Sequence, residues 1–213
     1  MAELDDFSRY ARIIPKEHIP ALSRDLKKIP DFSWLLGQPH QEIERLQGDL
    51  LRDFPTVYLD EKVEARSRNF TVMILNNTCD LPDGRLDFVT AAPVVDFNKY
   101  LEFERAQRLK AHTQLGETEK ARVEDSVREL ARVIRQNKKT EILFVPKFGE
   151  FQGGALVLLH LVCSVSTKIY HEALRAKQRL ASFTQTGFYF LLIKLTTHIA
   201  RAESTQVMRK EVA

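Results

Sequence analysis

FTVMILNNTCDLPDGRLDFVTAAPVVDF, residues 70–97, is the stretch that decides the fold. Its run VMIL at 72–75 is continuously apolar and bounded by polar residues, which is typical of a strand buried on both faces. Residues 88–95 have strand character again, and Pro82 and Gly84 supply the dihedral angles of a tight turn between the two runs. We therefore predict two core strands joined by a polar hairpin.

Pro93 lies inside the second of these runs and has no N–H to donate to a neighbouring strand. Proline in a sheet is confined to edge strands, to the first residue of a strand and to bulges. We therefore expect Pro93 at a bulge or on the unpaired side of an edge strand. Such a position is common where a sheet bends to close.

Helices are expected on both sides of this strand pair. Residues 1–52 have apolar residues at helical spacing that prolines interrupt, so we expect several short helices, the last of them through Leu50. A first strand is expected at 55–60, and the polar run 61–69 is expected to be a loop. Residues 98–139 predict a long helical insertion with one apolar stripe. The stripe consists of Val123, Val127, Leu130 and Ile134.

The C-terminal half adds a second strand pair and a final helix. Residues 141–147 and 155–165 have strand character, and the glycine-containing segment 149–154 between them predicts a hairpin. Residues 179–182 are ambiguous. Residues 184–201 carry apolar side chains over a wide face, which predicts a C-terminal helix buried against the sheet or against a second subunit.

No internal repeat, low-complexity run or linker interrupts the sequence, so we predict a single domain over residues 1–213. The expected fold class is α+β. The architecture would be a small SH3-like β-barrel or a strongly bent antiparallel sheet, with N-terminal helices, a helical insertion and a C-terminal helix. Segments 55–97 and 140–167 would supply the strands.

The composition indicates a cytoplasmic protein. The opening residues lack the basic region and apolar core of a signal peptide. The apolar run 188–193 is too short to span a bilayer, so no membrane partner is expected. Cys79 and Cys163 are too few for a disulfide framework, and both are expected to be reduced.

The formal net charge of +3 is unevenly distributed, with a basic excess in 98–139 and an acidic excess in 70–97. Contact with nucleic-acid phosphates would therefore use the helices. Within the insertion, Arg128, Arg132 and Arg135 recur at helical spacing. This row is either a stripe that contacts phosphates or a solvated face interleaved with acidic residues.

The strand pair resembles the core of the plasmid-maintenance growth-inhibitor toxins, the MazF/PemK/Kid-like group with its small SH3-like barrel. In that family a strand of the type VVLS leads into a polar loop, as VMIL at 72–75 does here. The next strand has a proline preceded by small or apolar residues, like AAPVV at 91–95. A later strand has an acidic position shortly before Ser-Val, and HLVCSV at 160–165 is similar. The polar loop is also similar to that of a wider group of bacterial proteins with this barrel.

The resemblance implies metal-independent binding or cleavage of single-stranded RNA, with an antitoxin-like protein and a second copy of the chain as partners. Such cleavage needs a base for the 2′-hydroxyl, an acid for the leaving oxygen and a cation for the developing charge. Asp80 would be the base, His160 the acid and Arg68 the cation, although Arg66 also matches the family's arginine. The binding residues expected beside them are Asn76, Asn77 and Thr78.

The chain departs from the family pattern in three places. His160 stands at the acidic position, Ser166 stands where the family usually has Asp, and the insertion 98–139 is foreign to the compact toxins. Each catalytic candidate also has a structural interpretation. Asp80 could be a turn former, His160 a hydrogen-bonded sheet residue and Arg68 a solubilising loop residue.

No cofactor or metal is expected. The six histidines are scattered, and neither cysteines nor histidines recur at the spacing of a metal site. The glycines of 149–154 lack the lysine and following helix of a phosphate-binding loop. Cys79 is expected to be a small buried residue, because the negative charge of the adjacent Asp80 would disfavour the thiolate and so oppose nucleophilic chemistry.

Two functions follow from these patterns. The first is an RNA-binding or RNA-cleaving protein related to the toxins, which the resemblance and the arginine row favour. The second is a non-catalytic protein-interaction module on a barrel scaffold, with the C-terminal helix as a dimer contact. The acidic strands favour the second function.

Overall fold

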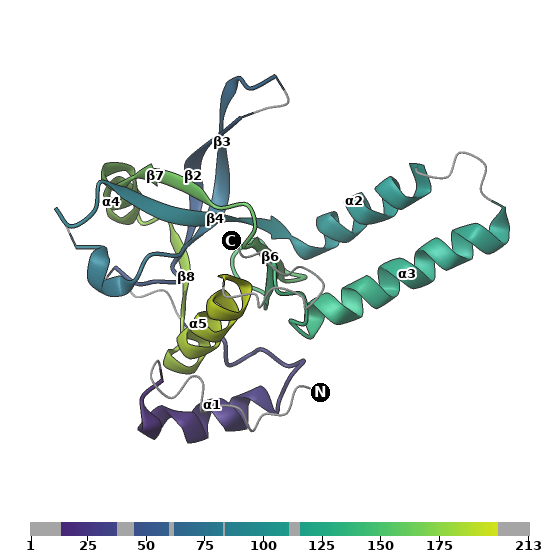
Figure 1. Ribbon diagram of the computed structural model, residues 1–213, viewed down its shortest axis with the longest axis horizontal. Helices are drawn as coiled ribbons and strands as arrows, with labels where there is room; N and C mark the ends of the chain where they lie inside the picture. Colours follow the sequence, from purple (N-terminus) through teal and green to yellow (C-terminus); the bar gives the residue numbers. More distant parts are fainter. Residues whose placement is uncertain (1–13, 38–44, 60–61, 83, 111–115, 200–213) are drawn as a thin grey trace, which may run out of the picture.

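The computed structural model describes residues 14–37, 45–59, 62–82, 84–110 and 116–199. These residues form an α+β fold with five α-helices and an eight-stranded antiparallel sheet (Figure 1). The strands are β1 (Leu36–Gly37), β2 (Leu50–Leu59), β3 (Ala65–Ile74), β4 (Phe88–Asp96), β5 (Ile142–Val145), β6 (Ala155–Leu158), β7 (Cys163–Ser166) and β8 (Arg179–Phe183). The helices are α1 (Ile19–Leu26), α2 (Phe97–Lys110), α3 (Glu117–Arg135), α4 (Thr167–Arg175) and α5 (Gln185–Ile199), with short 3-10 turns η2 (Lys16–His18) and η3 (Thr78–Asp80).

The sheet is bent and open. Its strand order is β1-β8-β2-β3-β4-β6-β5, and β7 pairs with β4 as well. One edge of β4 therefore faces β3, whereas its other edge pairs first with β7 and then with β6. Strand β7 also contacts β2 without pairing with it, so the sheet curves back toward β2 around its centre. Of the two expected architectures, the bent sheet is the one observed, and no pairing among the described strands closes it into a barrel.

Strands β3 and β4 form the buried centre of the sheet, as the sequence predicted. Met73 and Ala92 belong to a first hydrophobic core on one face. Val72, Ile74 and Ala91 belong to a second core on the other face. Because successive residues of a strand point to opposite faces, two covered faces allow a continuous apolar run.

Pro93 lies in an interior strand, which corrects the expectation of an edge. The amide of Leu75 donates to the carbonyl oxygen of Thr90, so the backbone of Thr90 faces β3 and that of Pro93 faces the opposite edge. On that edge Ala91 is the last residue paired with β7 and Val94 is the first paired with β6. Proline is accommodated because it falls between the two partners of β4.

The first core lies under α1 and α5. Helix α5 buries Phe190, Leu191 and Leu195 in this core, which confirms the predicted C-terminal helix and its burial against the chain's own sheet. Gly187 lets α5 approach the backbone before β1, since a Cβ atom there would lie 2.1 Å from the carbonyl oxygen of Leu35. Any larger residue at this position would force the helix away from the sheet.

The second core lies under α4, for which the sequence patterns gave no prediction. Tyr170 and Ala173 of α4 pack with Leu51 and Phe54 of β2 in this core. The α4 sequence places Ile169, Tyr170, Ala173 and Leu174 at helical spacing, and its four buried residues are both polar and apolar. The apolar residues of α4 therefore carried a helical signal, which the sequence analysis did not use.

Two boundaries near β2 and β3 were predicted wrongly. Leu50, expected in a helix, begins β2 and pairs with Met73. The expected loop 61–69 is a strand from Ala65 onward, and its residues 65–69 are all exposed. These residues pair through their backbones with β2, and such pairing leaves no hydrophobic pattern. The helical residues expected in 1–13 and 38–44 lie outside the described residues.

The expected strand 155–165 is divided into β6 and β7 by a turn in which the amide of Leu161 donates to the carbonyl oxygen of Leu158. The division arises because the two halves pair with different segments of β4. The predicted hairpin between β5 and β6 is confirmed by their antiparallel register. The ambiguous residues 179–182 belong to β8.

The helical insertion consists of two helices, α2 and α3, which project together from the sheet (Figure 1). We call this pair the arm. Val123, Val127 and Ile134 of the predicted stripe are buried, and Leu130 is half-buried. The insertion is therefore helical as predicted, and its apolar stripe holds α3 against α2 and the first core.

Candidate functional site

The polar loop after β3 is held by its own side chains. The side-chain oxygen of Asn76 accepts from the backbone amide of Thr90, and that of Asn77 accepts from the amide of Cys79 at 3.1 Å. The hydroxyl of Thr78 accepts from the amide of Gln47 at 3.0 Å. The three loop residues among those expected to bind RNA thus make intrachain bonds that shape the loop.

The two cysteines differ in environment. Cys79 is exposed in η3, contrary to the expectation of a buried residue, and Cys163 is half-buried on β7. The thiol of Cys163 lies 3.4 Å from the carbonyl oxygen of Ala91, and burial raises its pKa. A raised pKa keeps Cys163 in the thiol form and makes it a poor nucleophile.

The three catalytic candidates lie on different parts of the sheet. Arg68 is exposed on β3, and its guanidinium carbon lies 5.2 Å from the centroid of the Phe70 ring. Asp80 is exposed in η3, beyond the far end of β3. From Arg68 to Ile74 the strand advances about 3.3 Å per residue, or roughly 20 Å in all. His160 is exposed after β6, with Nδ1 3.3 Å from the carbonyl oxygen of Glu141.

Among the described residues, no hydrogen bond or ion pair joins any two of Asp80, Arg68 and His160. Their assignment as base, cation and acid stays a prediction from the sequence. The strand direction explains the separation, because Arg68 lies in the first half of β3 whereas Asp80 lies in η3, beyond the end of the strand. Nearness in sequence across one strand does not bring side chains together when the strand is extended.

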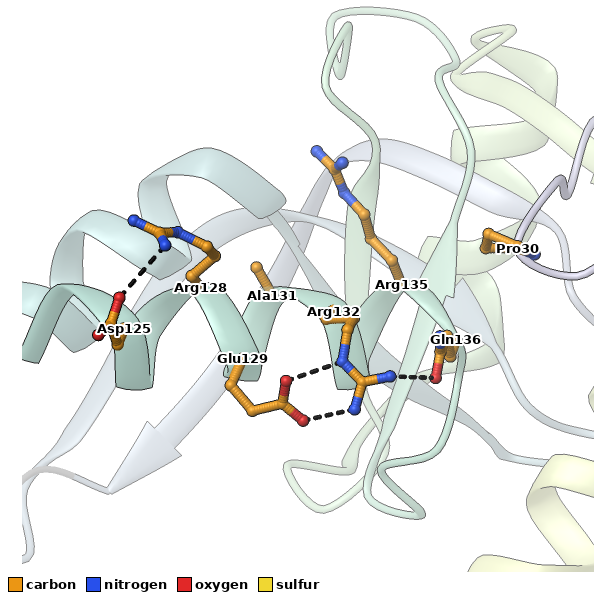
Figure 2. A pocket seen from close by; sticks show the side chains of 8 residues that line it. All are labelled: Pro30, Asp125, Arg128, Glu129, Ala131, Arg132, Arg135 and Gln136. Atoms are coloured by element: carbon orange, nitrogen blue, oxygen red, sulfur yellow. Dashed lines mark hydrogen bonds and ion pairs between the residues drawn. The ribbon is translucent and has the colours of Figure 1, made fainter. Parts of the chain in front are cut away.

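The arginine row lies along the exposed face of α3 and lines a pocket of about 520 Å³ with Pro30 (Figure 2). Arg128 pairs with Asp125 at 3.2 Å. Arg132 makes two bonds, of 2.6 and 2.7 Å, to the carboxylate of Glu129. The hydrogen bond from Arg132 lowers the pKa of the Glu129 carboxyl, so that this pair stays ionised.

Arg135 differs from the other two arginines, since its guanidinium carbon lies 4.9 Å from the centroid of the Phe97 ring. In Figure 2 its side chain points away from the Glu129 carboxylate. Two of the three positive charges in the row are thus balanced by carboxylates on the same helix. This pairing corresponds to the interleaved, solvated face considered from the sequence.

A second groove runs between the two helices of the arm and has a volume of about 510 Å³. Arg105 of α2 pairs across it with Glu124 of α3 at 2.9 Å. Phe103 of α2 is 58 % exposed. The arm therefore presents mixed charge and one exposed aromatic ring to solvent.

A buried polar cluster joins β2 to β8 where β2 begins. Asp49 is fully buried, accepts from the hydroxyl of Ser182 at 2.7 Å and pairs with Arg179 at 2.8 Å. The ring of Tyr170 is buried beside this pair, and burial raises the pKa of its hydroxyl. Sequence analysis missed this cluster because Asp49 and Ser182 are far apart in the chain and form no motif.

Lys194 of α5 is a further buried charged residue. Its ammonium group donates to the carbonyl oxygen of Asn137 at 2.7 Å and also to that of Lys139. Both carbonyls follow the C-terminus of α3, where a positive charge is favourable. Burial nevertheless lowers the pKa of Lys194 to about 8. Lys194 thus fastens α5 to the base of the arm.

Strands β2 and β3 continue beyond the rest of the sheet as a two-stranded hairpin, which projects separately from the arm (Figure 1). We call residues 54–59 and 65–70 the ribbon. Pairing of β3 with β4 begins only at Thr71, and pairing of β2 with β8 ends at Leu51. Within the part of the chain that the structure describes, both outer edges of the ribbon are therefore unpaired.

Neither membrane spans nor metal sites occur in the described residues. None of the helices is long and apolar enough to cross a bilayer. No group of three or more His, Cys, Asp or Glu side chains could hold a metal ion there. Comparison of the chain with protein-family models, with curated proteins and with solved structures gave no match.

Proposed function

We propose that this chain is a non-catalytic protein-interaction module and that the ribbon is its docking surface. The observation that carries the proposal is the pair of unpaired strand edges on a hairpin that projects from the sheet. An unpaired edge offers a row of backbone donors and acceptors to an added strand. An antitoxin-like protein would be one partner of this kind.

The base of the ribbon is held by buried contacts, which supports a role in binding. The Asp49–Arg179 pair and the Ser182 hydroxyl fix β2 to β8, and Phe54 is buried in the second core. A docking strand would therefore meet a preorganised edge and lose less conformational freedom on binding. Both cysteines are free, which suits the reducing cytoplasm that we propose as the compartment.

Site-specific photo-crosslinking in the natural host tests this function. A photoreactive phenylalanine analogue is placed at Val57 on the ribbon or, as the matched control, at Phe103 on the arm. The two side chains are equally accessible, with exposures of 59 % and 58 %. We expect a discrete protein adduct from position 57 and none of the same mass from position 103. Absence of any adduct at position 57, with efficient expression of the variant, would refute the proposal.

Binding or cleavage of single-stranded RNA is the second candidate function. It is favoured by the stacking of Arg68 over Phe70, which puts a cation and an aromatic ring together on an exposed strand. The test is incubation of the protein with a long single-stranded RNA without added metal, beside Asp80→Asn and Arg68→Ala. Cleavage that both substitutions abolish would support this function, and intact RNA without binding would exclude it.

A further inference from the structure

We propose that the outer edge of β3 in the ribbon binds an extended acidic protein segment as an additional antiparallel strand. This inference rests on the proposed function and specifies the edge, the residues and the chemistry of the partner. It depends on the direction of the β3 backbone, on the difference between the two ribbon edges and on the charges along β3.

The backbone direction of β3 follows from three hydrogen bonds. The Thr56 hydroxyl donates to the carbonyl oxygen of Arg68, and the amide of Ile74 donates to the carbonyl oxygen of Asp49. Even-numbered residues of β3 therefore face β2. The amide of Leu75 points the other way, toward β4. Since N–H and C=O groups alternate along a strand, the groups of odd-numbered residues lie on the edge away from β2.

Three residues consequently present backbone groups to solvent along the unpaired part of this edge. They are Ala65, Ser67 and Asn69. Each has an N–H and a C=O group, and their side chains are all exposed. Alternate exposed groups over residues 65–70 match the spacing that one antiparallel strand of about six residues requires.

The β2 edge of the ribbon is protected against such pairing. Pro55 is opposite Asn69, so the position of its missing N–H group lies on the outer edge of β2. Asp53 has a φ of 51°, and the register shifts between Leu51 and Phe54. A proline and a bulge are two devices by which edge strands avoid added strands. The β3 edge has neither over residues 65–70.

Charge selects an acidic partner. Arg66 and Arg68 share one face of the ribbon, because they are two residues apart on one strand. Residues of an added strand opposite them would form non-hydrogen-bonded pairs, in which the side chains are closest. Arg66 already pairs with Glu64 at 2.6 Å, so Arg68 is the principal anchor. Phe70 would contact the next position of the partner strand on the same face, so we expect the partner segment to carry an apolar residue two positions before its first acidic residue.

A second copy of the chain fits this edge poorly. Antiparallel pairing of two β3 edges centred on Ser67 would place Arg66 of one copy opposite Arg68 of the other. Like charges that lie directly opposite each other destabilise a strand pair. An acidic heterologous segment avoids this repulsion and gains ion pairs instead.

The test uses the full-length chain and a fluorescent, end-blocked hexapeptide of sequence Val-Thr-Glu-Thr-Glu-Thr, with binding followed by anisotropy. The counterpart peptide has lysine in place of both glutamates. We expect the acidic peptide to bind about tenfold or more tightly than the lysine peptide, because two charge pairs change sign.

Two substitutions at Ser67 separate the edge from the fold. Ser67→Pro removes an outward N–H group that makes no bond to β2, and it should weaken the acidic peptide about tenfold or more. Ser67→Thr keeps the N–H group and a strand-forming side chain, and it should bind within about twofold of the native chain. Circular dichroism and thermal melting of both variants check that the sheet is intact.

Charge reversal gives an independent readout. Arg68→Glu should reverse the preference, so that the lysine peptide binds more tightly than the acidic one. Equal binding of the acidic peptide by Ser67→Pro and Ser67→Thr, or no binding by the native chain, would overturn the inference. The inference would also be overturned if self-association of the chain or single-stranded RNA displaced the peptide while Ser67→Pro bound the peptide as tightly as the native chain does.

The outcomes distinguish this inference from the proposed function. A protein adduct at position 57 without peptide binding would leave the ribbon as a docking surface and reject the acidic strand. Absence of both would reject both proposals. Peptide binding that depends on Ser67 and Arg68 supports the edge itself.

Discussion

The arm and the ribbon both project from the sheet, but they satisfy their polar groups in different ways (Figure 1). The helices of the arm bond their backbones internally, and ion pairs such as Arg105–Glu124 and Arg132–Glu129 balance their surface charges. In the ribbon, the backbone hydrogen bonds of the paired strands run only between β2 and β3. A helical hairpin can therefore end in solvent as a complete structure, whereas a strand hairpin leaves backbone groups unpaired along its edges.

The largest expected effect is at the base of the ribbon. Asp49→Ala would leave the buried Arg179 without its carboxylate, so we expect a loss of about 3–5 kcal/mol in the free energy of unfolding. Urea denaturation followed by circular dichroism measures this loss. A loss below about 1 kcal/mol would mean that solvent reaches the cluster and that the base of the ribbon is not rigidly held.

The core of the arm should be less sensitive. Val127 is buried, and Val127→Ala removes two methyl groups, for an expected cost of about 1–2 kcal/mol. Hydrogen exchange should show faster opening of α2 and α3 and unchanged protection of β3 and β4. Equal acceleration in the central strands would show that the arm and the sheet unfold as one unit.

Amide exchange can also sharpen the description of the ribbon edge. The amides of Arg66 and Arg68 face β2, whereas those of Ser67 and Asn69 face solvent. We expect the second pair to exchange about tenfold or more faster than the first, because only the first pair is hydrogen bonded. NMR-detected exchange of the native chain measures the difference. Uniform rates along residues 65–70 would contradict the assigned backbone direction.

The buried lysine at the base of the arm predicts a dependence of stability on pH. The folded-state pKa of Lys194 is lowered by burial to about 8 from its ordinary value of 10.5. Between these two values the unfolded chain binds more protons, so stability rises with pH. From pH 7.5 to 9 we expect the native chain to gain about 1 kcal/mol relative to Lys194→Met. The same pH profile in both proteins would exclude a lowered pKa.

Surface ion pairs of the arm should have the smallest effect. Arg132→Ala removes an exposed pair, and we expect the free energy of unfolding to change by less than about 1 kcal/mol. Thermal melting at low and at high salt measures this change and its screening. A larger loss would show that the arginine row packs in a way that its exposed ion pairs do not explain.

The sequence predicted those parts of the fold that have a local hydrophobic pattern. The run at 72–75 and the α3 stripe both indicated their burial correctly, because strand and helix periods are visible in single segments. Residues 65–69 escaped prediction because their strand is defined by pairing with β2 and all five are exposed. The Asp49–Arg179 cluster escaped because its members meet only in the folded chain.

The roles of the candidate site residues could not be predicted from the sequence, because they depend on contacts between distant segments. Polar residues such as Asn76 and Thr78 suit a binding loop and a self-bonded loop equally well, and here their side chains bond within the chain. Asp80 and Arg68 are near in sequence, but the extended second half of β3 separates them. The β3 edge has no residue signature, since its donors and acceptors belong to the backbone.

Both projections depend on anchors that are synthesised late. Arg179 and Ser182, which hold the base of the ribbon, and Lys194, which holds the base of the arm, follow every residue of the two projections in the chain. A nascent chain therefore exposes the ribbon and the arm before either base can be completed. The chain through residue 194 must therefore be available to fold before both bases can be completed.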